Sequence, residues 1–304
     1  MNAAVTVFFL IIKVFSLYFL AVSLFGLCSS RRPEPAARLR RFAVLIAARN
    51  EESCIAGLIE SLRAQHYPPE LVDIWVLPNN CTDRTAEAAR RAGAQVLEMP
   101  ASVRSKGAAL HTAAKALLRS ARNYDAFCVF DADNEADPAF LSEMNRALDR
   151  TAIVKSRILA KNRTQAGISA CYEIYFCSAN HFLNRAREAV GLSARVIGTG
   201  FAIRRDLLEA LDGFPCRTLT EDAELYAACL CRGARIGYCE TAVTYDEEPV
   251  TWRASLVQRR RWMSGILQVA RLTLPELLTN FLRQPSLNCL DGLLQLSFPF
   301  LQAL

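Results

Sequence analysis

The stretch FAVLIAA at residues 42–48 is a continuous apolar run, and Arg49, Asn50 and Glu51 follow it directly. A short apolar run that ends in polar residues is typical of a strand buried on both faces of a sheet. The run therefore predicts an interior β-strand, with the three polar residues at its carboxyl end.

Strand-like and helix-like segments alternate after this run. Strand-like runs recur at residues 72–77, 94–99 and 127–130. Apolar residues at helical spacing, or runs rich in alanine, lie between them at about 51–64, 82–92 and 106–121. This alternation predicts an α/β fold, Rossmann-like, whose mostly parallel sheet is covered by helices on both faces.

The second half of the chain is less regular. It predicts helices at residues 167–190, 219–231 and 251–269, and a strand at 196–203 that Gly198-Thr199-Gly200 interrupts. The tail at residues 285–304 is apolar apart from Asp291. It is compatible with an interfacial helix and with part of a second membrane span, and the sequence leaves both open.

Ligands of open parallel sheets bind beyond the carboxyl ends of the strands. The polar groups at those positions are residues 49–51, residues 79–83 and Asp131-Ala132-Asp133. Asp131 and Asp133 point to the same side of an extended chain. Such a pair suits Mg²⁺ or Mn²⁺ together with phosphate oxygens, and a polar turn that ends a strand is the simpler alternative.

A second acidic group, Thr220-Glu221-Asp222, stands at the start of a predicted helix. Thr218 and Glu221 have the spacing of a capping box, and a carboxylate in the first turn is favoured by the helix dipole. The functional alternative is a general base that deprotonates an acceptor hydroxyl. Both hold if Glu221 caps the helix while Asp222 faces a cleft.

The segment QRRRW at residues 258–262 brings Gln258, Arg261 and Trp262 onto adjacent parts of one helix face. Guanidinium groups bind diphosphate oxygens, and indole rings stack on sugars. Arg259 and Arg260 point elsewhere on the helix, and we expect them to contact lipid headgroups.

Residues 3–28 are almost wholly apolar, with Lys13 as the one charge. A helix of this length would run roughly 39 Å, enough to cross a bilayer with some tilt. A cleaved signal peptide would begin with basic residues, and the start of this chain has none. A lipoprotein signal would have a small residue directly before Cys28, where this chain has Leu27. The segment is therefore interpreted as a retained signal-anchor.

Arg31, Arg32, Arg38, Arg40 and Arg41 cluster just after this span and supply much of the formal charge of +6. Positive flanks stay on the cytoplasmic side, so everything after the helix is predicted to face the cytosol at the inner or plasma membrane. We interpret the net positive charge as a signal for membrane topology and as a means of contact with membrane lipids. No nucleic-acid-binding motif is present in the sequence.

The eleven cysteines form no CxxC pair and the three histidines are scattered, so zinc-site spacing is absent from the sequence. Cysteines in apolar runs, such as Cys128 and Cys171, are typical of small buried residues in a reducing compartment.

Six motifs in order resemble those of glycosyltransferase family 2, in particular its membrane-bound branch with the cellulose, chitin, hyaluronan and poly-N-acetylglucosamine synthases. They are residues 47–51, residues 79–83, Lys106-Gly107, Asp131-Ala132-Asp133, Thr220-Glu221-Asp222 and residues 258–262. The resemblance covers residues 42–265 and implies a GT-A fold for them. It leaves residues 1–28 as the transmembrane anchor, 29–41 as a basic juxtamembrane linker and 266–304 as a membrane-associated tail.

The resemblance also implies a nucleotide-sugar donor, a divalent cation (Mg²⁺ or Mn²⁺) and inversion at the anomeric carbon. By resemblance, the catalytic base is Asp222, the metal ligand is Asp133, the acceptor-binding residues are Trp262 and Glu221, and the donor-binding residues are Ala48, Glu51, Asn79, Lys106, Asp131, Gln258 and Arg261.

Three positions depart from the family pattern. Many relatives have an aspartate at the position of Asn79, where it reads the uracil ring, and many have proline and tyrosine where this chain has Ala47 and Arg49. Asn79 can still accept a hydrogen bond, so a UDP-sugar is the expected donor.

Three functions follow from the sequence. The first is an inverting hexosyltransferase that acts on a lipid-linked or polysaccharide acceptor at the cytosolic membrane face. The second is a processive polysaccharide synthase that needs export partners, because one sure span cannot enclose a channel. The third is a membrane protein that binds nucleotide sugars without turnover.

Overall fold

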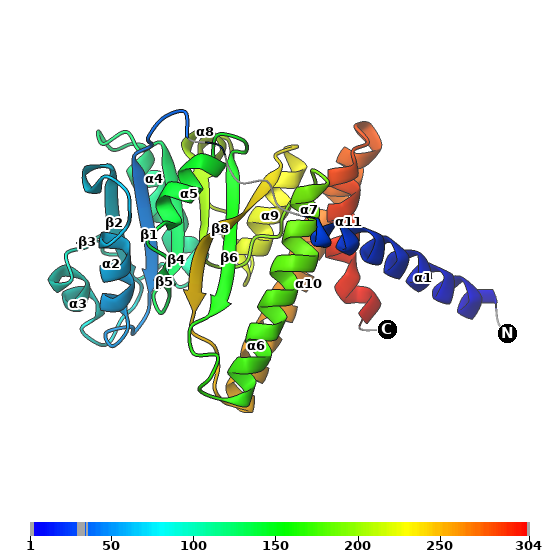
Figure 1. The fold of residues 1–304 in the computed structure, drawn as a ribbon, viewed down its shortest axis with the longest axis horizontal. Coiled ribbons are helices and arrows are strands. Elements are labelled where there is room, and N and C mark those ends of the chain that lie inside the picture. Colours follow the sequence, from blue (N-terminus) through cyan, green and yellow to red (C-terminus); the bar gives the residue numbers. More distant parts are fainter. Residues whose placement is uncertain (1–2, 29–33, 35, 303–304) are drawn as a thin grey trace.

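The computed structural model describes residues 3–28, 34 and 36–302 of the chain (Figure 1). Within these residues the centre is an eight-stranded sheet with the order β3-β2-β1-β4-β7-β6-β8-β5. The strands are β1 (Phe42–Ala48), β2 (Val72–Pro78), β3 (Gln95–Val96), β4 (Ala126–Asp131), β5 (Glu135–Ala136), β6 (Ile153–Ala160), β7 (Phe201–Arg204) and β8 (Ile236–Asp246).

Helices cover both faces of the sheet. One face carries α2 (Ile55–Arg63), α3 (Thr85–Arg91) and α5 (Phe140–Ala147). The other carries α4 (Lys106–Leu118), α8 (Arg205–Ala210) and α9 (Glu221–Cys231). Outside α9 lie α10 (Trp252–Arg283) and α11 (Leu287–Gln302), which pack against α9 and against each other. Short 3-10 turns occur at Phe25–Leu27 and Pro69–Leu71.

The apolar run that begins the domain forms β1, an interior strand, as predicted. It pairs in parallel with β2 on one side and with β4 on the other. Successive side chains of a strand point to opposite faces. Phe42, Val44 and Ile46 accordingly pack in the core beneath α2 and α5, whereas Ala43 and Leu45 pack in the core beneath α4.

The register of β1 brings three polar turns to one edge of the sheet. Ala47 pairs with Leu77 of β2 and with Asp131 of β4, so the carboxyl ends of these strands lie side by side. The turns after β1 and β2 each contain an asparagine with positive φ, Asn50 at 61° and Asn80 at 53°. Asparagine adopts this left-handed conformation more readily than most residues, which lets the chain turn sharply there.

The second half of the sheet is where sequence and structure differ. The sequence did not predict β5, β6 or β8. β6 pairs in parallel with β8, whereas β7 runs antiparallel to both β4 and β6. The strand predicted at 196–203 begins only at Phe201, because Gly200 has φ of +60°, which a strand cannot accommodate.

The predicted helix at 167–190 is one continuous run of three parts: α6 (Gly167–Ser178), a π-helix (Ala179–Arg185) and α7 (Ala186–Ala189). Residues in the π-helix pack on the carboxyl end of the N-terminal helix α1 (Ala3–Leu24). Gly26 permits this approach, because a Cβ there would lie 2.3 Å from the His181 carbonyl oxygen.

The helix predicted to end near residue 269 continues to Arg283. The reason is tertiary: Val269, Ala270, Thr273 and Leu277 are buried in the contact with α9 and α11. The tail then folds back as α11 on the outside of α9 and α10.

Among the described residues, Val5–Leu27 is the one segment long and apolar enough to cross a membrane, with a mean hydropathy of 2.4 and almost all of its residues outside the core. Figure 1 shows α1 leaving the domain beside α11 and projecting away from it. The arrangement is compatible with a membrane span at the N-terminus.

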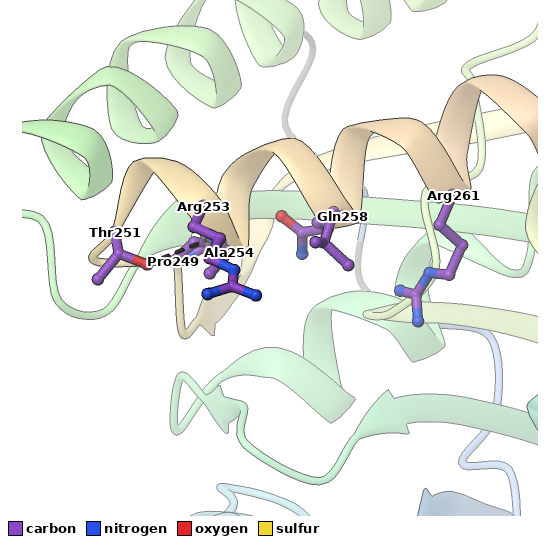
Figure 2. A pocket seen from close by; sticks show the side chains of 7 residues that line it. Pro249, Thr251, Arg253, Ala254, Gln258 and Arg261 are labelled. Atoms are coloured by element: carbon purple, nitrogen blue, oxygen red, sulfur yellow. Dashed lines mark hydrogen bonds between the residues drawn. The ribbon is translucent and has the colours of Figure 1, made fainter.

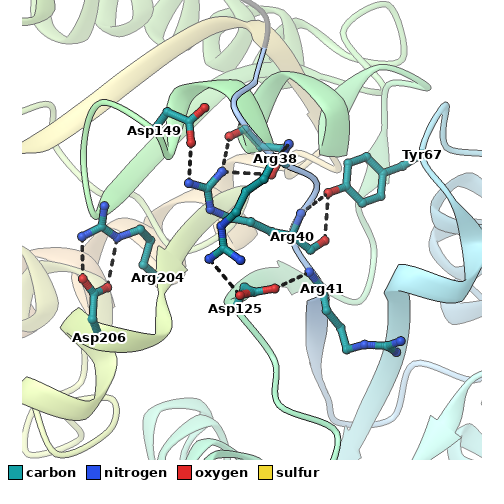
Figure 3. A network of polar contacts seen from close by, with 9 residues as sticks. Arg38, Arg40, Arg41, Tyr67, Asp125, Asp149, Arg204 and Asp206 are labelled. Carbon is teal, nitrogen blue, oxygen red and sulfur yellow. Dashed lines mark hydrogen bonds and ion pairs between the residues drawn. The ribbon is translucent and has the colours of Figure 1, made fainter.

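The segment that precedes β1 is held by polar contacts to the domain (Figure 3). Arg40 lies 2.5 Å from Asp149 Oδ1 and also donates to the carbonyl oxygen of Asn145 at 2.9 Å. The Tyr67 hydroxyl donates to the Arg40 carbonyl oxygen and accepts from its amide, both at 2.8 Å. Arg38 pairs with Asp125 at 2.9 Å.

These contacts correct part of the sequence interpretation. Arg40 is buried, so the prediction that it contacts lipid headgroups is wrong, and Arg41 lies 3.6 Å from the Asp73 carboxylate. The local sequence shows the positive charges but not the aspartates that fold against them. Arg31 and Arg32, of the same predicted cluster, lie outside the described residues.

One buried ion pair joins three helices near the base of α1. Arg187 of α7 donates two hydrogen bonds to Asp291 of α11, both at 2.9 Å, and both side chains are almost fully buried. The Tyr18 hydroxyl of α1 donates to the same carboxylate at 2.8 Å. The Arg187 guanidinium also lies over the ring of Phe19.

Substituting Asp291 by alanine should lower the free energy of unfolding by about 3–5 kcal/mol, because the Arg187 charge is then buried without a partner. Glu209→Ala is the matched control: it removes an exposed pair with Arg205 and should cost no more than about 0.5 kcal/mol. Thermal unfolding in detergent measures both, and equal effects would contradict the role of the buried pair.

Candidate functional site

A cleft of about 560 Å³ opens where the carboxyl ends of β1, β2 and β4 face the start of α9 and the side of α10. Every site residue predicted from the sequence lines it. They are Ala48, Glu51, Asn79, Lys106, Asp131, Asp133, Glu221, Asp222, Gln258, Arg261 and Trp262. These residues are spread over more than 200 positions of the chain, and the fold alone brings them together.

Lys106, the first residue of α4, is the cation at the centre of the cleft. Its Nζ lies 2.5 Å from Asp131 Oδ1 and 3.1 Å from Glu221 Oε1, and it donates to the Gly198 carbonyl oxygen at 2.7 Å. Burial lowers the pKa of Lys106, but the Asp131 and Glu221 carboxylates outweigh burial and hold it above the ordinary value. Lys106 therefore stays charged and links β4, α9 and the loop before β7.

Asp131 ends β4, and its backbone is fixed from the neighbouring loop. Its amide donates to Thr199 Oγ1 at 3.0 Å and to Asn134 Oδ1 at 3.2 Å. Its carboxylate is engaged by Lys106. The paired carboxylates predicted from the sequence thus have different environments, since Asp133 has no such cation beside it among the described residues.

Asp133 lies in a group of carboxyls that repel one another. Burial, with the Asp246 and Asp131 carboxylates, raises the pKa of Asp133 to about 8. Burial and Asp131 also raise the pKa of Asp246, at the end of β8, to about 7. Glu248 is buried, its pKa is raised by burial and by Asp246 to about 9, and its Oε1 has no hydrogen-bond partner.

These carboxyls fit a divalent cation. A cation beside Asp133 would offset the repulsion that raises the three pKa values. No group of three or more His, Cys, Asp or Glu side chains in the described residues is arranged to hold a metal alone. That is the usual case for Mg²⁺, which takes one or two carboxylates and completes its shell with phosphate oxygens and water.

Asp222 is the second residue of α9 and points into the cleft. Its Oδ2 accepts a hydrogen bond from the Gly198 amide at 2.7 Å, and its Oδ1 accepts from the Ala223 amide at 2.8 Å. Two backbone donors hold a carboxylate in one orientation and leave lone pairs free on both oxygens.

The capping box predicted for Thr218 and Glu221 is wrong. The N-cap of α9 is Thr220, whose side chain makes no capping hydrogen bond, and Glu221 turns to Lys106 instead. The buried Glu224 instead holds the segment before the helix, because its carboxylate accepts hydrogen bonds from the amides of Arg217 and Thr218 at 2.9 and 3.0 Å. The ion pair with Lys106, a tertiary contact, outweighs the local capping preference of Glu221.

At the opposite end of the cleft, Ala48 closes β1 and its carbonyl oxygen accepts from the Asn79 amide at 2.9 Å. The Asn79 side chain donates to the Ser105 carbonyl oxygen at 3.2 Å and accepts from Asn80 at 2.8 Å. Glu51 Oε2 accepts a hydrogen bond from the Cys54 thiol at 3.1 Å. One N–H and one lone pair of the Asn79 amide remain for a ligand.

The α10 side of the cleft is organised by Tyr172 of α6. Its hydroxyl donates to Gln258 Oε1 at 2.9 Å, and its ring meets Trp262 edge-on with centroids 6.2 Å apart. The guanidinium of Arg259 lies over the same ring at 5.2 Å. Arg259 thus contacts protein while the residue stays exposed, and its contact with lipid headgroups stays a prediction.

A second hollow of about 590 Å³ adjoins the cleft along the first turns of α10 and shares Gln258 and Arg261 with it. Figure 2 shows Arg253, Gln258 and Arg261 directed from α10 to the same side. Arg253 and Arg261 form no ion pair with the described part of the chain. Arg261, which lines both hollows, therefore gives the cleft a guanidinium group with no carboxylate partner among the described residues.

Sequence reasoning missed several lining residues. Asp246 ends β8 and Glu247 follows it, and the rule that polar residues at a strand end mark a site would have found them had β8 been recognised. Thr199 and Arg195 come from the loop before β7, and Tyr175 comes from α6. Their positions depend on tertiary packing and carry no sequence signal.

The model of the family described as "Glycosyltransferase like family 2" matches residues 40–265, about three quarters of the chain. The chain belongs to this glycosyltransferase family. The family assignment made from the six motifs is confirmed at this level.

Curated relatives agree with this assignment. The glycosyltransferase is 28% identical over 239 residues to "Probable glycosyltransferase YdaM" of Bacillus subtilis, covering 75% of this chain and 55% of that protein. It is 26% identical over 233 residues to "Beta-monoglucosyldiacylglycerol synthase" of Synechocystis, covering 73% and 47%. The chain spans about half the length of the curated relatives it matches.

Solved structures confirm the GT-A fold. The mannosyltransferase PcManGT of Pyrobaculum calidifontis, solved with GDP-Man and Mn²⁺, is similar with a TM-score of 0.67 at 18% identity, covering 96% of this chain and 83% of that one. TarS 1–349 of S. aureus, solved with UDP-GlcNAc, gives a TM-score of 0.58 at 17% identity, covering 86% and 73%.

We expect Asp133→Asn to raise the melting temperature of the metal-free protein at pH 8.5 by about 2–4 °C. Because the folded-state pKa of Asp133 is raised to about 8, its contribution to stability is present below about pH 4 and is lost as the pH rises through 8. The asparagine cannot ionise, so it escapes this loss. At pH 3.5 the carboxyl is mostly protonated in both the folded and the unfolded state, so the two proteins should melt within about 1 °C of each other.

The same variant should no longer be stabilised by Mn²⁺ with UDP. Asp212→Asn is the control, because Asp212 is exposed, is paired with Lys115 and lies away from the cleft. If Mn²⁺ and UDP stabilise the Asp133 and Asp212 variants equally, Asp133 is not the metal ligand.

Proposed function

We propose that this protein is an inverting hexosyltransferase that moves a sugar from a nucleotide-sugar to a lipid-linked or polysaccharide acceptor at the cytosolic face of the membrane. One observation carries the proposal: a single cleft holds the Asp222 carboxylate, the Asp133 carboxyl and the free Arg261 guanidinium. Inverting transfer needs one base, and a place for the charge of the leaving diphosphate.

The donor end of the cleft is assigned from charge. A divalent cation at Asp133 would neutralise the diphosphate when bound. Lys106 is held in place by Asp131 and by Glu221, and Arg261 has no ion-pair partner in the described residues, so both can face developing negative charge. Gln258, one turn before Arg261, is oriented by the Tyr172 hydroxyl.

The base and ribose of the nucleotide would lie at the strand ends, against Ala48, Glu51 and Asn79. The Asp131 carboxylate would face the nucleotide. A uridine nucleotide is the proposed donor. The TarS structure named above was solved with UDP-GlcNAc, whereas PcManGT was solved with GDP-Man, so the fold itself serves either base.

Asp222 is the proposed base. It takes the proton of the acceptor hydroxyl while the hydroxyl oxygen bonds to the anomeric carbon. The bond from that carbon to the donor diphosphate oxygen breaks in the same step, and its electrons leave with the nucleoside diphosphate. The Gly198 amide, 2.7 Å from Oδ2, orients the carboxylate for this transfer.

The acceptor end has an apolar rim. Tyr175, Leu219, Trp262 and Ile266 line the cleft there, and Tyr175 and Leu219 are exposed. Such a rim suits a sugar ring stacked on Trp262 and a lipid beside it. The glycolipid synthase of Synechocystis named above, together with the membrane helix, supports a lipid-linked acceptor.

Glu221 is the second proposed acceptor contact. Lys106 engages its Oε1, and no described residue pairs with its Oε2, which can therefore accept from an acceptor hydroxyl.

Asp222→Asn should reduce transfer by a factor of about 10² to 10⁴, because the amide cannot take a proton. Donor affinity should change by less than about threefold, since Asp222 touches none of the proposed diphosphate ligands. Turnover and calorimetric binding of UDP with Mn²⁺ would be measured together. Near-normal turnover would remove Asp222 from the role of base.

A donor panel tests the function as a whole. Membranes that carry the protein would be incubated with uridine- and guanosine-linked sugars plus Mg²⁺ or Mn²⁺, and nucleotide release would be measured. We expect release with a UDP-sugar that depends on the metal, and at least about 100-fold less from membranes with the Asp222→Asn protein. Absence of nucleotide release with every donor would refute the proposal. The length of the product distinguishes the addition of a single sugar from polymer synthesis.

A further inference from the structure

A fully buried lysine lies directly behind the cleft. Lys155 of β6 has none of its side chain exposed and forms no ion pair with any described residue. Its Nζ donates to the carbonyl oxygens of Thr199 at 2.8 Å and Gly200 at 3.2 Å, and lies 3.4 Å from Ser156 Oγ. Burial lowers the pKa of the Lys155 amine to about 7, which shows that a lysine at this position is costly to charge. Its retention there therefore needs a reason.

The segment that Lys155 holds, Gly198-Thr199-Gly200, is the point where the site residues meet. The Gly198 amide donates to Asp222, and the Gly198 carbonyl oxygen accepts from Lys106. Thr199 Oγ1 accepts from the Asp131 amide. The Gly200 amide donates to the Val129 carbonyl oxygen of β4 at 2.8 Å, which ties the segment to the sheet.

The segment is also pressed against the strands behind it. Gly200 has φ of +60°, and a Cβ there would lie 2.4 Å from Thr244 Oγ1 and 2.5 Å from Ser156 Oγ. The Gly200 carbonyl oxygen additionally accepts from the Ser156 amide at 2.9 Å. Lys155 and Ser156 therefore fix consecutive carbonyl groups of one short segment from the side away from the cleft.

Asp222 depends on this segment more than the other site residues do. Lys106 has two carboxylates besides the Gly198 carbonyl, and the Asp131 amide has Asn134 besides Thr199. Among the described residues, the Asp222 carboxylate has one long-range donor, the Gly198 amide. Loss of order in the segment would thus affect the orientation of Asp222, the proposed catalytic base, more than it affects the donor site.

We propose that Lys155 is a positioning residue: by donating to the carbonyls of Thr199 and Gly200, it holds the Gly198 amide where it orients Asp222. The inference rests on the proposed role of Asp222 as base and assigns this lysine a part that none of the six sequence motifs contains. Lys155 touches neither donor nor acceptor, since it lies behind the segment and does not line the cleft.

The full-length protein would be compared in membranes with Lys155→Met, which keeps the length of the side chain and removes the donor group. We expect kcat to fall at least about tenfold, with the affinity for UDP and Mn²⁺ within about threefold and the melting temperature no more than about 3 °C below that of the parent. Lys115→Met is the control: Lys115 is accessible, pairs with the exposed Asp212 and does not line the cleft, so its loss should leave kcat within about twofold.

Hydrogen exchange supplies a readout that needs no turnover. The peptide over residues 197–201 should exchange at least about tenfold faster in Lys155→Met, whereas the peptide over β1 should not change. Exchange and kcat both unchanged would overturn the proposal. So would joint loss of melting temperature, UDP affinity and kcat, which indicates a merely structural role. If the parent protein shows no transfer with any donor, the proposed function fails, and the exchange result still decides whether Lys155 orders the segment.

Discussion

The parallel pairing of β1 with β2 and β4 is the constraint on which the site depends. Ala47 is level with Leu77 and with Asp131, so three polar turns end at one edge of the sheet. A shift of one residue in either pairing would turn the side chains of that strand to the other face. The alternating burial of β1 in two separate cores fixes this register.

The electrostatics of the cleft follow from that register. Carboxyl groups from the ends of β4 and β8 and from the start of α9 converge on one cleft, and Lys106 neutralises those nearest to it. Asp133 and Asp246 keep raised pKa values because burial and mutual repulsion are not offset there. The free protein thus carries acidic groups that a cation and a diphosphate would stabilise together, with Arg261 on the opposite wall.

The N-terminal helix is attached to this domain by specific contacts. Gly26 allows a close approach to the π-helix, the carbonyl oxygen of Cys28 accepts from Arg185, and Tyr18 donates to the buried Asp291. The segment before β1 is pinned in addition by Arg40 and Arg38. These contacts set where the candidate membrane span leaves the domain.

The sequence by itself determined the α/β alternation, the interior position of β1 and the identity of eleven of the residues that line the cleft. It could do so because strand-end polarity and apolar periodicity are local properties. It missed β6 and β8, since β8 carries polar residues along much of its length and β6 includes the buried Lys155. Their apolar pattern is weak, and their place in the sheet is set by pairing with each other and with β7.

Only the tertiary structure decided how each side chain is used. Glu221 matches a capping box in sequence, yet it pairs with Lys106, which lies 115 positions earlier in the chain. Arg40 is buried against Asp149 and Arg259 lies over Tyr172, although both belong to basic runs typical of a membrane surface. Local sequence can specify a residue's intrinsic preference, but not the distant charge or ring that outweighs it, because that partner is supplied by the fold.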